Sequence, residues 1–157
     1  VEDYNWIMAH ALNPDDDHIM QRRLVHHELN HKFLQAYHAT AHQQWAQSHA
    51  KLGRIPYRPL TKDMDPDGVA AERFFLTNYS GTSPHEEQAT WGEFFMIPEK
   101  HVALVRKIRD EKDLVIREIL AIKYAQVKNE YRVASGGKMN DQYWDAMMRE
   151  GLKLEGK

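Results

Sequence analysis

Apolar residues recur every three or four positions along much of this chain, a spacing that places them on one face of an α-helix. Asn13 and Pro14 form a helix-start signal, because Asn caps a first turn well and Pro suits the first helical position. The next Gly or Pro is Gly53, so the pattern predicts one long helix over about residues 14–52. A shorter amphipathic helix is expected before it, over residues 4–12.

The second half of the chain continues the helical pattern. Ser83 is followed by Pro and, three positions after the Ser, by Glu, which predicts a helix over residues 84–96. A second long helix is expected over about residues 98–133, and a short one over residues 69–76. A last amphipathic helix presents Tyr143, Trp144, Met147, Met148 and Leu152.

Residues 53–68 contain three Pro and two Gly and are therefore expected to form an extended surface connection. No clear strand pattern is present. The predicted fold class is all-α: a single mainly helical domain, residues 1–157, forming an elongated helical bundle or hairpin around the two long helices. The apolar runs, such as residues 119–122, are far shorter than the roughly 20 residues that span a bilayer, so no transmembrane segment is expected.

The composition excludes several classes of function. The chain has 157 residues and no cysteine, which rules out disulfides, iron–sulfur clusters and a thiol nucleophile. Its 21 basic and 23 acidic residues give a formal net charge of −2, without the basic excess typical of nucleic-acid-binding proteins. The unusual number is ten histidines, most of which lie between His18 and His49.

His27, Glu28 and His31 match the H-E-x-x-H pattern on a strongly predicted helix. Histidines four residues apart share a face and can both bind zinc, while the intervening Glu serves as general base toward a metal-bound water. A third ligand would come from one of three glutamates that the sequence does not distinguish: Glu72, Glu86 and Glu87. These residues define an alternative interpretation, a zinc-dependent hydrolase with Glu28 as its catalytic residue.

Three observations count against that interpretation at the level of the sequence. A helix rich in histidine produces such spacings by composition alone. Leu34 and Tyr37 stand where a metzincin has Gly and His. No strand is expected beside the site for pairing with a substrate. Zinc is therefore an alternative, and no cofactor is favoured.

Asp63, Asp65 and Asp67, followed by Gly68, reproduce the first half of a calcium loop, in which alternate carboxylates surround a hard cation. The twelfth position of such a loop is a bidentate Glu, but here it is Phe74. An acidic turn without a metal explains the same residues. Calcium is thus a second alternative that the sequence does not favour.

Five histidines recur at intervals of four and seven residues, which places them along one stripe of the first long helix. The stripe could be a multi-histidine metal or haem face, a pH-sensitive interface, or a polar surface packed against another helix or subunit. The last interpretation is favoured, because histidine commonly lies at a boundary with one nitrogen hydrogen-bonded. Together with the last helix it predicts an interface formed by His27, His31, Leu34, His38, His42, Trp45, His49, Tyr143, Trp144, Met147 and Met148.

Two long helices offer more contact surface than so short a chain can cover. The sequence therefore favours a non-catalytic accessory or assembly subunit of a larger multiprotein complex, with other protein subunits as partners and no nucleic acid. The chain begins at Val1 rather than Met, which is weak support for an organellar protein that has lost a presequence. A mitochondrial respiratory-type assembly is the host that this start suggests.

Overall fold

The computed structural model describes residues 18–37, 45, 47–49, 52, 56–70 and 72–156. Within the first of these ranges, side chains are described for residues 22–32. This described part is helical and has no strand, which confirms the predicted all-α class. Its elements are α2 (His18–Tyr37), the 3₁₀ turn η2 (Tyr79–Gly81), α4 (Pro84–Met96), α5 (Pro98–Asp110), α6 (Leu114–Ala134) and α7 (Asp141–Glu155).

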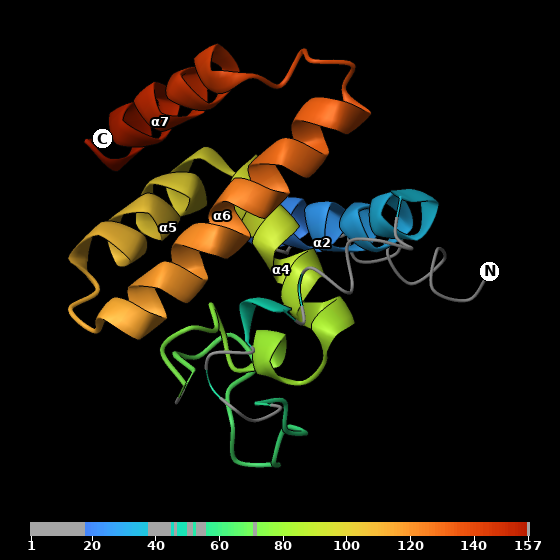
Figure 1. Cartoon of the computed structure of the whole chain (residues 1–157), viewed down its shortest axis with the longest axis vertical. Coiled ribbons are helices and arrows are strands. Elements are labelled where there is room, and N and C mark those ends of the chain that lie inside the picture. The colour runs from blue at the N-terminus through green and yellow to red at the C-terminus, as the bar shows by residue number, and fades with distance from the viewer. Residues whose placement is uncertain are drawn as a thin grey trace.

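Helix α4 lies at the centre of the arrangement (Figure 1). It crosses α2 and also contacts α5 and η2. Helices α5 and α6 run side by side in opposite directions, and α7 packs against α5. None of the described helices combines the length and the apolar character that a membrane crossing requires.

Capping residues explain where two of the predicted helices begin. The Ser83 side chain accepts a hydrogen bond from Glu86 N, and Pro84 occupies the first helical position of α4. Asn140 caps α7 in the same way, accepting from Tyr143 N. Both helices are confirmed, and α4 has both of its predicted ends.

The predicted continuous helix over residues 98–133 is wrong, because the chain forms two helices there. Helix α5 ends at Asp110 and α6 begins at Leu114. Asp113 adopts an extended conformation, and its side chain accepts hydrogen bonds from two backbone N–H groups of the next turn, which makes it the N-cap of a new helix. The break reverses the chain, so that α6 returns along α5 (Figure 1).

The predicted helix over residues 69–76 is also wrong, since its described residues form turns and bends. Phe74, Phe75 and Leu76 are consecutive and all buried, whereas a helix would point three consecutive side chains in different directions. The Ser80 hydroxyl oxygen accepts a hydrogen bond from Leu76 N at 3.1 Å. The Ser80 side chain thus accepts the hydrogen bond that a backbone carbonyl oxygen would accept in a helix.

The first predicted long helix falls only partly within the described residues. Helix α2 begins at His18 and ends at Tyr37. Residues 4–17, and most of residues 38–52, lie outside the described part of the chain. Residues 56–68, from the predicted connection, have no regular secondary structure apart from turns and bends after residue 61, and most of their side chains are exposed.

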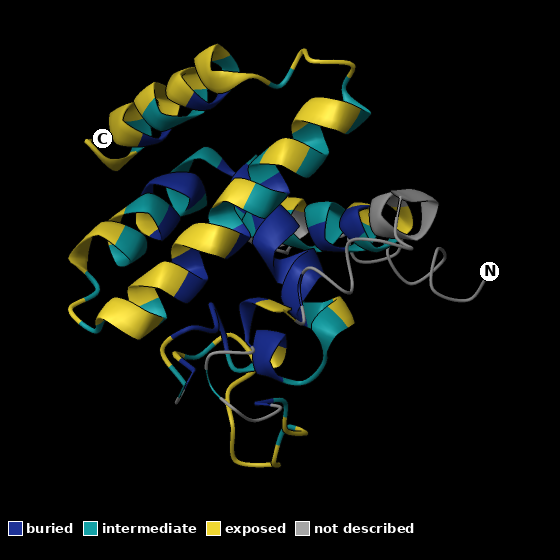
Figure 2. Ribbon diagram, in the orientation of Figure 1, coloured by how far each residue is buried: buried dark blue, intermediate teal, exposed yellow. Residues whose placement is uncertain are grey.

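The core lies around α4, most of whose residues are buried (dark blue in Figure 2). The Phe95 ring centroid lies 5.1 Å from that of Trp144 and 4.8 Å from that of Tyr124. The largest completely buried aromatic side chains are Trp45, Trp91, Trp144, Phe74 and Phe95. Helix α4 therefore connects this aromatic core to the crossing with α2, where polar side chains gather.

A close approach of α2 and α4 fixes how the two helices cross. A Cβ atom on Gly92 would collide with the side chain of Asn30, so any larger residue there would have to displace Asn30. Asn30 Nδ2 donates to the Gln88 carbonyl oxygen at 2.8 Å, and Tyr131 OH donates to Asn30 Oδ1 at 2.9 Å. These contacts determine which side chains face one another across the crossing.

Candidate metal centre

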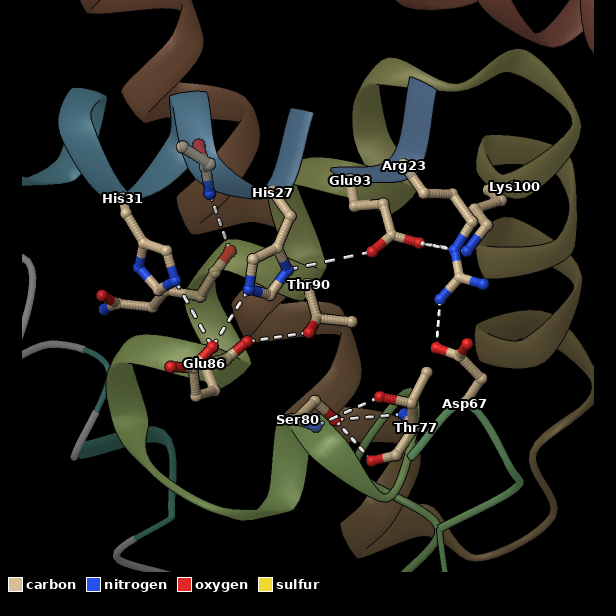
Figure 3. A network of polar contacts seen from close by, with 12 residues as sticks. Arg23, His27, His31, Asp67, Thr77, Ser80, Glu86, Thr90, Glu93 and Lys100 are labelled. Atoms are coloured by element: carbon tan, nitrogen blue, oxygen red, sulfur yellow. Dashed lines mark hydrogen bonds and ion pairs between the residues drawn. The ribbon is translucent and has the colours of Figure 1, made fainter. Parts of the chain in front are cut away.

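Polar side chains of α2 and α4 face one another at this crossing (Figure 3). Arg23, His27 and His31 are spaced four residues apart and therefore lie along one face of α2. Glu86 and Glu93 are seven residues apart and lie along the facing side of α4. The crossing thus brings two imidazoles opposite two carboxylates.

One oxygen of Glu86 contacts both histidines. Glu86 Oε2 lies 3.0 Å from His27 Nε2 and 3.3 Å from His31 Nε2. Ligand atoms of the three side chains all lie within 4.8 Å of one another, the one such group of three among the described residues. Ligand atoms around a tetrahedral zinc ion with bonds of about 2.0–2.1 Å lie about 3.3 Å apart. The two measured contacts are close to this value.

The charge of the group follows from its contacts. Burial opposes ionisation of Glu86, but hydrogen bonds with His27 and His31 outweigh it and hold the pKa of this carboxyl well below its usual range. The hydrogen bond with Glu86 raises the pKa of His31, although burial opposes that shift. Glu86 is therefore ionised at neutral pH and supplies the negative charge that a cation needs.

A second carboxylate lies behind His27. Glu93 Oε2 is 3.8 Å from His27 Nδ1, the ring nitrogen on the other side from the Glu86 contact. The Glu93 side chain is almost completely buried and is held by Arg23 Nε at 2.7 Å and by the Lys100 ammonium group. A carboxylate that accepts a hydrogen bond from the second ring nitrogen orients a metal-binding imidazole, and Glu93 lies just beyond that distance.

A cleft of about 290 Å³ opens beside His27. Glu28, the central residue of the H-E-x-x-H pattern, lines it together with Tyr79 from η2. The Tyr79 ring centroid lies 5.8 Å from that of His27. Burial and the carboxylates of Glu86 and Glu28 raise the pKa of Tyr79 to about 12. The cleft gives a small molecule, or part of a larger one, access to His27.

The structure distinguishes the three candidates for a third ligand. Glu86 is the one that joins the two histidines. Glu87 is completely buried and forms an ion pair with Lys123 instead. Glu72 lies 3.9 Å from Arg58, outside the group.

Three residues beside the histidines were not assigned to this site from the sequence: Arg23, Tyr79 and Glu93. Helical periodicity could have found Arg23, because it precedes His27 by four residues on the same face. It could also have related Glu93 to Glu86, but only after the face of α4 was known. No local signal exists for Tyr79, which reaches the cleft through the tertiary fold.

A second polar cluster lies in the core, one residue further along α4. Glu87 Oε2 accepts hydrogen bonds from Trp45 Nε1 and Tyr57 OH, each at 2.7 Å. The Lys123 ammonium group donates to Glu87 and, at 2.7 Å, to His49 Nε2. Glu87 and Lys123 are completely buried. This carboxylate therefore already has its own cation within the core.

The aspartates of the predicted calcium loop have partners within the protein. Asp65 Oδ1 accepts a hydrogen bond from Asp67 N at 3.0 Å, which closes a turn. The Asp67 carboxylate pairs with Arg23. Among the described residues, Asp63 and these two do not form a group with converging ligand atoms.

The predicted interface residues lie in different environments. Three are buried in the core, where they present no free surface: Trp45, His49 and Trp144. Three on α7 are partly buried: Tyr143, Met147 and Met148. Outside the described residues or side chains lie Leu34, His38 and His42. Since His27 and His31 face Glu86 while His49 contacts Lys123, the predicted stripe is divided between two sites.

The donor set determines what this arrangement can do chemically. Two imidazole nitrogens and one carboxylate oxygen form a ligand set found in catalytic zinc sites, where a fourth position stays open for water or substrate. Comparisons with protein-family models, with curated proteins and with solved structures gave no match to this chain. The function therefore has to be argued from the site itself.

Proposed function

We propose that this protein is a zinc-dependent hydrolase whose metal ion is bound by His27, His31 and Glu86. The observation that supports the proposal is the convergence of these three side chains, from two helices, beside an accessible cleft. Two His and one Glu form a ligand set known for catalytic zinc. The H-E-x-x-H pattern supplies two of these ligands, and the crossing with α4 supplies the third.

The contacts of His27, His31 and Glu86 favour a group of metal ligands over an ordinary ion pair. These three residues are called the ligand group below. One carboxylate oxygen lies close to nitrogens of two imidazoles, whereas a single histidine is sufficient for an ion pair. Glu86 and His31 are partly exposed, so an ion from the solvent can reach the three side chains. A divalent cation would be a partner for all three at once.

The residues around the ligand group have the roles that hydrolysis needs. When bound, zinc polarises a carbonyl group and lowers the pKa of a coordinated water molecule. Glu28 lines the cleft but lies outside the ligand group, so its carboxylate is available to accept a proton from the attacking water. Glu93 positions His27 from behind.

Metal binding is tested first, by mass-spectrometric metal analysis and zinc titration calorimetry on the full chain. We expect one bound zinc ion, and a loss of affinity of roughly 100-fold or more in His31→Ala, which removes a ligand. His26→Ala is the matched control, because His26 lies next to His27 on α2 but outside the ligand group. A wild-type chain that fails to bind zinc at micromolar concentration contradicts the proposal.

Hydrolysis is tested separately with Glu28→Gln. This variant is expected to keep its zinc affinity, because Glu28 is not a ligand. Its zinc-dependent cleavage of p-nitrophenyl acetate and of a fluorogenic peptide mixture should fall by about 100-fold or more, the usual contribution of a general base. A Glu28→Gln variant with wild-type activity would rule out this assignment.

We also propose that the chain is a subunit of a larger complex, a role compatible with the first. Helix α6 leaves four apolar side chains exposed: Leu114, Val115, Ile122 and Val133. Exposed apolar groups on one helix favour association with another protein. The Ile122→Glu variant is expected to leave the native complex and to migrate as the isolated chain in size-exclusion chromatography of cell extracts, with zinc affinity unchanged.

A further inference from the structure

The turn that carries Tyr79 is held from both sides. Tyr79 N donates to the Pro66 carbonyl oxygen at 2.9 Å. The next residue, Ser80, is completely buried. Its hydroxyl donates to the Thr77 carbonyl oxygen at 2.8 Å and accepts from Thr77 N at 3.0 Å (Figure 3). The backbone at Tyr79 is therefore fixed, and the side chain leaves it in a defined direction.

The Tyr79 side chain extends from this turn toward the metal centre. Its ring centroid lies 5.8 Å from that of His27, and both residues line the cleft together with Glu28. Tyr79 is 37% exposed, so a substrate in the cleft can reach it. Its hydroxyl hydrogen-bonds the carboxylate of Glu86, so a hydrogen-bond donor lies beside the ligand group on a rigid support.

We propose that Tyr79 is a catalytic residue whose hydroxyl donates a hydrogen bond to the oxyanion formed when a carboxylic ester or amide is hydrolysed in this cleft. The inference rests on the proposed function, because it needs the zinc site and Glu28. A phenol hydroxyl is a hydrogen-bond donor. Donors aimed at the position where negative charge develops are among the strongest contributions to catalysis.

The charges of the cleft favour a neutral carbonyl substrate over a phosphate ester. The cleft has one guanidinium, that of Arg23, and three carboxylates: Glu28, Asp67 and Glu93. Arg23 is already paired with Asp67 and Glu93, so it is not free to bind an anion. Phosphate recognition uses unpaired Arg or Lys groups. An ester or amide carries no charge until its carbonyl is attacked. One hydrogen-bond donor is then sufficient to stabilise the oxyanion.

The reaction balances with water as the only co-reactant. The water oxygen forms a bond to the carbonyl carbon, the C=O π pair moves onto the carbonyl oxygen, and Glu28 accepts one water proton. Tyr79 donates a hydrogen bond to the oxyanion and keeps its own proton. When the C=O bond re-forms, the bond to the leaving alcohol or amine breaks with its electron pair, and the proton on Glu28 passes to that group. The products are a carboxylic acid and an alcohol or amine.

The test compares Tyr79→Phe with Tyr143→Phe, a partly buried tyrosine of α7 outside the cleft. Activity on p-nitrophenyl acetate is measured as the difference between zinc-loaded and chelated protein. Because the hydroxyl acts where charge develops, Tyr79→Phe should lower kcat about 100-fold and leave KM and zinc affinity unchanged. Tyr143→Phe should leave all three unchanged.

A second readout does not depend on turnover. The hydrate of 2,2,2-trifluoroacetophenone resembles the tetrahedral intermediate, so its binding to the zinc-loaded protein, measured by calorimetry, reports the same hydrogen bond. The affinity should fall about 10-fold in Tyr79→Phe, as expected for a hydrogen bond to a charged oxygen. The Tyr143→Phe variant should bind it as the wild type does.

The outcomes separate this inference from the proposal on which it rests. If Tyr79→Phe binds zinc and matches the wild type in kcat and in analogue affinity, the role of Tyr79 is overturned while the zinc hydrolase stands. If Tyr79→Phe loses zinc affinity, the role is overturned as well, because Tyr79 then supports the metal site itself. A wild-type protein without zinc-dependent hydrolysis overturns both.

Discussion

Glu86 and Glu87 are neighbours in the first turn of α4, yet they belong to chemically different regions. One residue along a helix is a rotation of about 100°. Glu86 therefore faces α2 and contacts two histidines, whereas Glu87 faces the core and contacts Lys123 of α6. Glu86 is partly exposed and Glu87 is completely buried.

The two carboxylates differ in whether the protein itself supplies a cationic partner. At Glu87 the chain supplies the cation, and the Lys123 ammonium group also lies 5.2–5.7 Å from the ring centroids of three aromatic residues: Trp45, Phe74 and Phe75. Burial lowers the pKa of Lys123, while the charge of Glu87 opposes this shift. At Glu86 the partners are imidazoles beside a cleft, and this is the arrangement for which we propose a bound metal ion.

Replacing Glu87 by Gln is expected to have the largest effect on stability. The amide keeps the shape of the side chain but leaves the buried Lys123 ammonium group without a counter-ion. Breaking a buried pair in this way costs about 3–5 kcal/mol of the free energy of unfolding. Urea denaturation followed by circular dichroism measures the loss, and adding Lys123→Met should recover part of it by removing the unpaired charge.

Glu86→Gln is the matched control for that experiment, with the same change one residue away. Because Glu86 is partly exposed, the free energy of unfolding of the zinc-free protein should fall less than it does in Glu87→Gln. Zinc affinity should be lost in Glu86→Gln. Equal destabilisation by the two substitutions would show that the two carboxylates do not differ as their burial indicates.

Helix ends were predictable where a local signal was sufficient. Ser83 and Pro84 lie at the start of α4 as predicted, because a cap acts within one turn. The break before α6 was missed, since the run of charged residues there contains neither Pro nor Gly. Asp113 was not recognised as a cap. Arg73, distant in the sequence, binds Glu111 at 2.6 Å and Asp113 at 3.4 Å across that break.

The site was predictable to the same limited extent. The spacing of His27 and His31 indicated a possible zinc pair, because both lie on one helix. The choice between Glu86 and Glu87 depends on how α4 is rotated against α2, and that rotation is set by the contact of Gly92 with Asn30. Such a contact joins distant parts of the chain and has no local signature. The burial of Lys123 was equally unexpected, since lysine is almost never buried unless paired.

Acid is expected to weaken the region around Glu87. Burial and the charge of Lys123 lower the pKa of His49 to about 3, from about 6.5 for a free histidine. Unfolded His49 therefore binds a proton over a pH range in which folded His49 does not. Stability should fall as the pH decreases from about 6.5 toward 3, by about 1.4 kcal/mol per pH unit. His101, whose pKa burial lowers to about 4, contributes in the same direction.

Urea denaturation of wild type and His49→Gln between neutral and mildly acidic pH measures this effect. Gln can still accept a hydrogen bond from Lys123 but does not titrate. The free energy of unfolding of His49→Gln should therefore depend less steeply on pH, by about 1.4 kcal/mol per pH unit. Parallel pH profiles for the two proteins would contradict a neutral buried His49.

Glu93 combines properties of both regions and gives the smallest expected effect. It is almost completely buried and paired with cations, as Glu87 is, but it also faces a histidine of the ligand group, as Glu86 does. Gln at this position keeps an oxygen near His27 Nδ1 but lacks the negative charge. Zinc affinity should fall about 10-fold in Glu93→Gln, the lower end of the range for a residue that orients a metal ligand.

The control for this change is Glu99→Gln, because Glu99 pairs with Arg22 at 3.3 Å outside the metal centre. Its zinc affinity should equal that of the wild type. If Glu93→Gln lowers the free energy of unfolding but leaves zinc affinity unchanged, Glu93 has only the structural role of Glu87. If zinc affinity falls, a buried carboxylate can both hold α2 against α4 and orient a metal ligand, and the two regions are linked through this residue.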